Sequence, residues 1–302
     1  MTRGYVPSLL LLAALWGASY LFIKVAVDDI EPTTMMAVRA FSAGVLLAGY
    51  VVLTMGAGRA IAELHAAWRQ SLVLGTFNAA LPFFLIAWGE KHIDSSVAAV
   101  AQSTVPLFAF VIGLRFLPHE HVAAIRWVGV ALGIVGVAVL AGLDPSWGWW
   151  AFAGTLAVVL SSASYASSGI YAQLRVHATP GPVLAAGSML AGGLVLMPFG
   201  IAQAPSEAPG WKAVASVAAL TILGTFIAQL AFFRMLPLYG ARRITLVAYL
   251  IPAFAIFYGA VFLSEPLTSR MLAGLVLILG GVALGSGYLR LRRDAVAEEG
   301  PA

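Results

Sequence analysis

Long apolar runs separated by short polar gaps are the dominant pattern of this chain. A helix needs about 20 apolar residues to span a bilayer. Ten runs of about that length are bounded by charged residues or by Pro and Gly: 6–26, 33–55, 70–89, 95–117, 122–142, 149–172, 181–203, 212–235, 244–263 and 270–289. The longest polar gap, GAGRAIAELHAAWR, has only fourteen residues. The pattern therefore predicts an all-α membrane protein with ten transmembrane helices and no soluble domain between them.

Composition narrows the class of protein further. Of the 302 residues, 61% are hydrophobic and 10% are charged, whereas a soluble domain carries about 25% charged residues. These values exclude a soluble enzyme and a disordered chain. A net charge of +4 spread over many loops is too small for a nucleic-acid partner. The absence of cysteine excludes disulfides and thiolate metal or redox sites.

Positive charges in the short loops predict the orientation of the helices, because cytoplasmic loops carry an excess of Lys and Arg. An even number of spans places both termini on one side of the membrane. That side collects twelve positive residues: Arg3, Arg59, Arg69, Arg115, Arg126, Arg175, Arg234, Arg242, Arg243, Arg290, Arg292 and Arg293. The other side has four: Lys24, Lys91, Lys212 and Arg270. Both termini are therefore predicted to be cytoplasmic.

The two halves of the chain match each other. Three pairs of segments recur in the same order: LWGASY (15–20) with LSSASY (160–165), GTFNAALPFF (75–84) with GTFIAQLAFF (224–233), and VPLFAFVIGLRFL (105–117) with IPAFAIFYGAVFL (251–263). Glu120 and Glu265 each precede one glycine by nine residues and another by sixteen. The matches predict a first five-helix repeat over 1–142, a second over 143–289, and a cytoplasmic tail of basic and acidic residues over 290–302.

A repeat with an odd number of helices inserts into the membrane in two opposite orientations. Inverted repeats are characteristic of secondary transporters, which bind substrate near the bilayer midplane between the halves. The expected partners are therefore the lipid bilayer and a small-molecule substrate.

The residues that mark these helices also resemble a known family. WGASYLFIK in the first helix, Pro32 seven positions before Arg39, and Pro106 and Pro252 in helices four and nine are similar to EamA-type members of the drug/metabolite transporter superfamily. Within it, the chain most resembles the aromatic amino acid exporters of the YddG type. The resemblance implies a fold of 5 + 5 helices, a multi-pass location in the bacterial inner (plasma) membrane, and export of amino acids, related metabolites or lipophilic cations.

The second half departs from the family pattern at two places. It has Ser161 and Ser162 where the first half has Trp16 and Gly17, and it has no counterpart of Arg39. These positions cannot be assigned the same role in both halves.

Three prolines within the predicted spans mark candidate site residues, because proline lacks the donor that would bond the carbonyl four residues earlier. The prolines are Pro82, Pro106 and Pro252, and the freed carbonyls are those of Asn78, Gln102 and Ala248. Freed carbonyls are tolerated in a bilayer where they line a cavity or meet a neighbour. The side-chain amides of Asn78 and Gln102 can add donors and acceptors for a substrate. Hydrogen bonding between helices explains the same residues about equally well.

Aromatic and small polar residues on shared helix faces complete the candidate substrate site. They are Trp16, Ser19 and Tyr20 in the first helix, Ser164 and Tyr165 in the sixth, Phe226 and Gln229 in the eighth, and Tyr249 beside Pro252 in the ninth. An aromatic chamber with a few polar groups suits a small amphipathic ligand. Close helix packing is the competing explanation for the serines, and plain packing for any single aromatic residue.

Arg39 lies inside the second predicted span, where a charge is costly. It either contacts a substrate carboxylate, or it snorkels towards the outer surface or makes a structural pair. We favour the second interpretation, because the resemblance places Arg39 on a peripheral helix.

The acidic residues of the predicted spans sit at helix ends. Proton-coupled carriers usually hold an acidic or histidine side chain within the membrane, whereas Glu90, Asp94, Glu120 and Glu265 lie at the ends and the histidines lie in loops. We therefore expect facilitative transport, directed outward down the substrate gradient.

Other functional classes lack the motifs they require. HEHVA at 119–123 lacks the second histidine of an HExxH zinc site, and a channel would need charge rings or a filter loop. We therefore expect no enzyme activity, no cofactor and no bound metal. The predicted function is a secondary transporter that exports aromatic or large neutral amino acids by alternating access. The alternative is a polyspecific exporter of drugs or lipophilic cations.

The motif GVALG occurs at 129–133 and again at 281–285. Small residues let helices approach closely, either within the chain or across a dimer contact. The sequence leaves a monomer and a weak dimer equally open.

Overall fold

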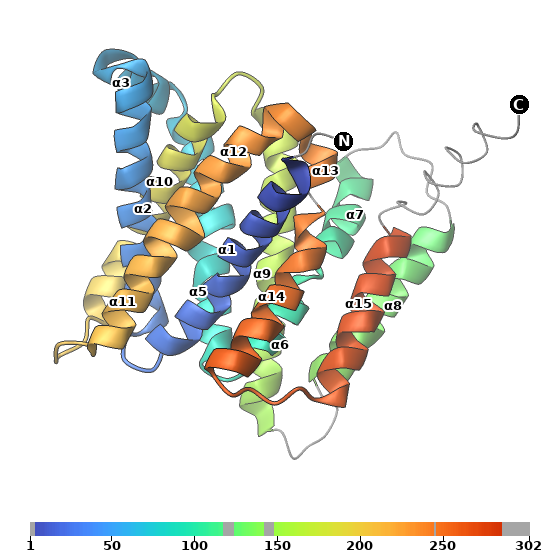
Figure 1. The fold of residues 1–302 in the computed structure, drawn as a ribbon. Helices are drawn as coiled ribbons and strands as arrows, with labels where there is room; N and C mark the ends of the chain where they lie inside the picture. Colours follow the sequence, from blue (N-terminus) through green and yellow to red (C-terminus); the bar gives the residue numbers. More distant parts are fainter. Residues whose placement is uncertain (1–3, 117–123, 142–147, 245, 286–302) are drawn as a thin grey trace, which may run out of the picture.

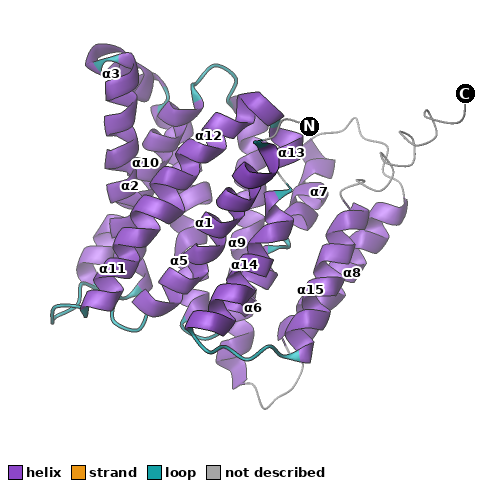
Figure 2. Cartoon of the chain, viewed as in Figure 1, coloured by secondary structure: helices purple, strands orange, loops and turns teal. Residues whose placement is uncertain are grey.

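The computed structural model describes residues 4–116, 124–141, 148–244 and 246–285. These residues form packed helices and no strand (Figure 1, Figure 2). The helices, with π-helical segments labelled η, are α1 (Tyr5–Ala26), α2 (Pro32–Met55), α3 (Ala57–Ala66), α4 (Trp68–Leu74), η1 (Gly75–Ala80), α5 (Leu81–Glu90), α6 (Ser95–Gln102), α7 (Val105–Phe116), α8 (Ala124–Ala141), α9 (Gly148–Arg175), α10 (Gly181–Ala202), α11 (Trp211–Ala219), η3 (Leu220–Ile227), α12 (Ala228–Tyr239), α13 (Ala241–Ile244), α14 (Val247–Phe262) and α15 (Ser269–Gly285).

The described part of each apolar run coincides with one helix or with consecutive helical segments. Within the described residues, six stretches are long and apolar enough to cross a membrane: Tyr5–Ala26, Pro32–Met55, Trp68–Glu90, Ser95–Phe116, Gly181–Ala202 and Trp211–Tyr239. Three further apolar helices, α8, α14 and α15, are shorter. Helix α9 is long, with 28 residues, but its serines make it more polar. The ten-span topology and the side of the termini stay predictions, and Glu120, the HEHVA segment and the tail lie outside the described residues.

The helices run between two faces of the molecule (Figure 1). The face at which α1 begins also carries α3 and the turn at Gly240, and we call it the α3 face. The opposite face carries the connections 27–31, 91–94, 203–210 and 263–268. The distribution of positive charge predicts that the α3 face is cytoplasmic.

The two GVALG motifs pack α8 against α15 within one chain. A Cβ atom at Gly281 would lie 2.5 Å from the carbonyl oxygen of Gly129, and one at Gly136 would lie 2.9 Å from the backbone nitrogen of Ile278. Only glycine permits backbones to approach this closely. The pair lies at one side of the molecule in Figure 1, and its glycines make close contacts within the chain.

Glycines also bring helices from the two predicted repeats together. A Cβ atom at Gly44 in α2 would lie 2.6 Å from the backbone nitrogen of Leu190 in α10. A Cβ atom at Gly193 in α10 would lie 2.6 Å from the backbone nitrogen of Phe41 in α2. The contact between α2 and α10 is therefore backbone to backbone, and it fixes the helix that carries Arg39.

Candidate substrate cavity

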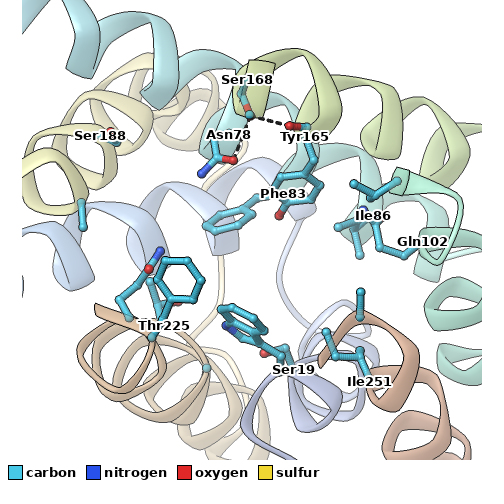
Figure 3. Close-up of a pocket in the computed structure, with 18 of the residues that line it drawn as sticks. Ser19, Asn78, Phe83, Ile86, Gln102, Tyr165, Ser168, Ser188, Thr225 and Ile251 are labelled. Carbon is cyan, nitrogen blue, oxygen red and sulfur yellow. Dashed lines mark hydrogen bonds between the residues drawn. The ribbon is translucent and has the colours of Figure 1, made fainter. Parts of the chain in front are cut away.

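A cavity of about 560 Å³ lies between helices of both predicted repeats. Residues of α1, α2, α4, η1, α5, α6 and α7 line it from the first repeat, and residues of α9, α10, η3, α12 and α14 from the second. Its volume falls within the roughly 300–1,000 Å³ of small-molecule sites. Figure 3 shows Phe83 and Tyr165 near each other, with Ser19 and Ile251 across the cavity from them.

Nine of the candidate residues from the sequence line this cavity: Trp16, Ser19, Tyr20, Asn78, Gln102, Pro106, Tyr165, Gln229 and Pro252. Four are not among the lining residues: Pro82, Ser164, Phe226 and Tyr249. The fold therefore brings most of the candidates to one place, while their binding of a substrate stays a prediction.

The four residues outside the lining have other contacts. The Ser164 hydroxyl donates to the Phe77 carbonyl over 2.6 Å, which is the interhelical role weighed against a site role. Pro82 is buried within α5. Phe226 and Tyr249 pack against the main hydrophobic core. Pro82 and Ser164 are buried, whereas Phe226 and Tyr249 are only partly buried.

Serines of α9 hold the two amides in the cavity wall. The Ser168 hydroxyl lies 2.9 Å from Asn78 Oδ1, as the dashed line in Figure 3 marks, and the Ser161 hydroxyl lies 2.6 Å from Gln102 Oε1. Ser162 donates to the Gln102 carbonyl over 3.3 Å. Each amide can make more hydrogen bonds than these, and the remaining capacity is available to a ligand.

The backbone is irregular at matching places in the two repeats. Segment η1 falls within GTFNAALPFF and η3 overlaps GTFIAQLAFF. Only the first of these sequences contains a proline, so Pro82 is not the common cause of the π-helical turns. Such turns are frequent at functional sites, and these two place Asn78 and Thr225 in the cavity wall.

Arg39 differs from the interpretation of the sequence in one respect, because it does not snorkel towards the surface. Its side chain is 6% exposed and lines the cavity instead of reaching the surface. Its Nε donates to Thr225 Oγ1 over 3.0 Å, and its Nη1 lies 3.7 Å from the Met36 sulfur. The guanidinium carbon lies 4.1 Å from the ring centre of Phe83, a cation–π contact. This position excludes snorkelling.

Sequence reasoning also missed aromatic residues of the wall. Phe83 and Phe232 line the cavity, and the ring centres of Trp16 and Phe232 lie 6.1 Å apart. A signal was present, because a pair of phenylalanines ends both matched segments, at 83–84 and at 232–233.

Two buried glutamates near the opposite face differ in their partners. Glu265 accepts hydrogen bonds from the backbone nitrogens of Ser95 (2.7 Å) and Ser96 (3.0 Å) and from the Ser96 hydroxyl (2.6 Å), so it caps the start of α6. Glu90 is fully buried, and neither carboxylate oxygen has a partner within the described residues. Lys24 donates to the backbone carbonyl of Glu90 over 2.7 Å.

Two side chains in the 91–94 connection have shifted pKa values. Burial raises the pKa of Asp94, and the neighbouring carboxylate of Glu265 raises it further. Burial lowers the pKa of His92, and the positive charges of Lys91 and Lys24 add to the effect. Both shifts are in the direction of the neutral form. In the part of the chain that the structure describes, no three His, Asp or Glu side chains are placed to hold a metal ion.

Comparison with known proteins shows what this chain is similar to. The profile of the EamA-like transporter family matches residues 5–142 and again residues 152–287. An uncharacterized transporter of Archaeoglobus fulgidus is 27% identical over 91% of this chain and 95% of its own length. The uncharacterized inner membrane transporter YedA of Escherichia coli is 27% identical over 92% of this chain and 89% of its own. A crystal structure of a protein with 21% identity superposes with a TM-score of 0.65, covering 96% of this chain and 100% of that one.

Proposed function

We propose that this chain, which belongs to the EamA-like transporter family, exports aromatic and other large neutral amino acids by alternating access. It is a multi-pass protein of the inner membrane, the location in the name of its relative YedA. The narrower assignment to amino acid export, of the kind known for YddG-type exporters, rests on the chemistry of the cavity and not on these relatives, which are named uncharacterized transporters.

The observation that carries this proposal is the composition of the cavity wall. Aromatic side chains line it together with the amides of Asn78, Gln102 and Gln229. The aromatic side chains of the wall suit a substrate with an aromatic or large apolar side chain. The amides can form hydrogen bonds with the amino and carboxyl groups of a zwitterion.

Contacts between the two repeats support alternating access. Near the opposite face, Glu265, Asp29 and Thr33 each hydrogen-bond to a residue of the other repeat. The cavity wall extends the other way, to Leu184 and Ala172 near the ends of α10 and α9 at the α3 face. We infer that this conformation is closed at the face opposite α3. Substrate then enters the cavity from the α3 face, which is the predicted cytoplasmic side.

The proposed transport is facilitative. Acidic and histidine side chains are missing from the described residues that line the cavity, so these residues offer no proton carrier beside the substrate. An imposed pH gradient that drives uphill accumulation in vesicles would contradict this part of the proposal.

Counterflow in proteoliposomes tests the function directly. Vesicles loaded with unlabelled phenylalanine are expected to accumulate labelled phenylalanine transiently without any ion gradient. Tyr165→Ala, in the cavity wall, is expected to lower affinity about fivefold, from about 1 kcal/mol for one aromatic contact. Tyr249→Ala is the matched control, because Tyr249 is outside the lining. Absence of phenylalanine counterflow, in vesicles that move a lipophilic cation, would favour the polyspecific exporter instead.

A further inference from the structure

The charge of Arg39 in the cavity wall has no ion-pair partner among the described residues, although the buried Glu90 is near enough to interact with it electrostatically. Arg39 is the single charged side chain among the described residues that line the cavity, and it is 6% exposed. Burial of a charge is costly unless an opposite charge and hydrogen bonds compensate it. The salt bridges within the described residues join other side chains, Arg59 with Glu63 and Lys91 with Glu31. The cavity therefore offers a buried cation to whatever enters it.

The present contacts of Arg39 leave much of the guanidinium unused. A guanidinium carries five N–H donors in a planar fork. The contacts in the structure are the Nε bond to Thr225, the long contact of Nη1 with the Met36 sulfur, and the face of Phe83. A carboxylate can take two parallel hydrogen bonds from such a fork. The ligand that completes this geometry and neutralises the charge is an anion.

We propose that Arg39 is the binding residue for the carboxylate of the transported solute. The inference rests on the proposed function and narrows it to solutes that carry a carboxylate beside an apolar or aromatic body. Phe83, whose ring lies against the guanidinium, connects this carboxylate site to the aromatic part of the cavity wall. Asn78 and Gln102 remain available for the amino group.

A purely structural role of Arg39 predicts a different behaviour. In that case the bond to Thr225, 186 residues away in the chain, would simply hold α2 against η3. Loss of the arginine would then lower the amount of folded protein, but the carboxylate of a ligand would make no difference to binding. Selectivity between ligands therefore separates the two roles.

The first test uses the wild-type protein alone. Phenylalanine counterflow is inhibited with 3-phenylpropionate, which keeps the carboxylate and lacks the amine, and with phenethylamine, which keeps the amine and lacks the carboxylate. The phenylpropionate is expected to inhibit at least tenfold more strongly, a difference of about 1.4 kcal/mol. Equal inhibition, or stronger inhibition by the amine, would overturn the proposal.

The second test changes the cation. Arg39→Gln is expected to raise the half-saturation concentration of phenylalanine at least tenfold and to abolish the preference for phenylpropionate. Arg39→Lys, which keeps the charge without the fork, is expected to retain part of the preference. Thr225→Val is the control, since it removes a partner of Arg39 and leaves the charge in place. A preference that persists in Arg39→Gln would refute the assignment.

A binding measurement separates this inference from the proposed function. The melting temperature of the purified protein in detergent is recorded with each of the two inhibitors. If the wild type moves no phenylalanine, the proposed amino acid export fails. The carboxylate site still stands in that case if phenylpropionate, and not phenethylamine, stabilises the wild type and leaves Arg39→Gln unchanged. Stabilisation by both compounds alike, or by neither, would refute the site.

Discussion

Glu265→Gln is expected to open the molecule at the face opposite α3. Glu265 belongs to the second predicted repeat and accepts three hydrogen bonds from the start of α6 in the first. Glutamine keeps one acceptor oxygen and places an amide NH₂ where the other stood. At least one of the donors, the backbone nitrogen of Ser95 or of Ser96, then loses its partner and faces another donor.

The size of this effect follows from the hydrogen bonds and the negative charge at the start of α6 that the substitution alters. A hydrogen bond to a charged group contributes about 1.5–3 kcal/mol, and a negative charge at a helix N-terminus adds about 0.3–1 kcal/mol. Their loss shifts the balance between closed and open conformations by about 2–4 kcal/mol. A shift of 2 kcal/mol corresponds to about 30-fold in population.

Glu90→Gln is the matched control. Glu90 is also buried near this face, but its carboxylate oxygens have no partner to lose within the described residues. The substitution also removes an ionisable group whose charged form is costly to bury. It is therefore expected to leave the closed conformation unchanged or more stable.

Cysteine labelling reads out the conformation without interference, because the chain has no cysteine of its own. Ser19→Cys, in the cavity wall, is probed with a membrane-impermeant maleimide added to intact cells. Labelling is expected to be slow in the protein that carries Ser19→Cys alone. It is expected to be faster when Glu265→Gln is added, and to stay equally slow when Glu90→Gln is added. Equal labelling rates in all three proteins would refute the role of Glu265 in closing this face.

Three further outcomes follow from the packing and charges described above. Gly44→Ala is expected to lower the stability by about 1–3 kcal/mol, because its new Cβ atom would lie 2.6 Å from the α10 backbone. Gly49→Ala in the same helix has nothing within 4 Å of the new atom. It is therefore expected to leave thermal unfolding unchanged. Gly281→Ala should likewise lower the melting temperature. Gly280→Ala should not, because its new atom would stay 3.5 Å from its neighbour. Equal melting temperatures for the two variants of α2, or for the two of α15, would contradict the packing. Because the raised pKa of Asp94 means that the folded state binds this proton more tightly, wild-type stability should fall as pH rises from the usual value of about 3.8 through the raised one. Asp94→Asn should be the more stable protein at neutral pH, with the advantage vanishing in acid; an advantage independent of pH would refute the assignment.

The helices could be predicted from the sequence because their signal is local. A run of about 20 apolar residues is sufficient to indicate a helix that can cross a membrane, and the described part of every such run is mostly helical. The lining residues Tyr20 and Tyr165 were found through the match between the halves, which is equally a property of the sequence.

The surroundings of single side chains could not be predicted in this way. Ser164 and Tyr165 are adjacent in the chain, yet one bonds the Phe77 carbonyl and the other lines the cavity. The direction of each follows from which helix packs beside α9. Arg39 is the clearest case, since its partner Thr225 lies 186 residues away and no local pattern connects them.

The two repeats kept a common backbone and diverged in charge at the cavity. Thr76 and Thr225 occupy matching positions, and each hydroxyl donates a hydrogen bond to a backbone carbonyl of the preceding turn. The acceptor is the carbonyl of Leu72 for Thr76 and that of Leu220 for Thr225. Only Thr225 also accepts a hydrogen bond from Arg39, and the second repeat has no matching arginine. Two cations facing one small cavity would repel each other strongly in a medium of low dielectric constant, whereas one cation can be neutralised by one carboxylate. In the proposed mechanism, similar helices in both halves serve opening and closing, while a single arginine gives the site between them one defined place for an anion.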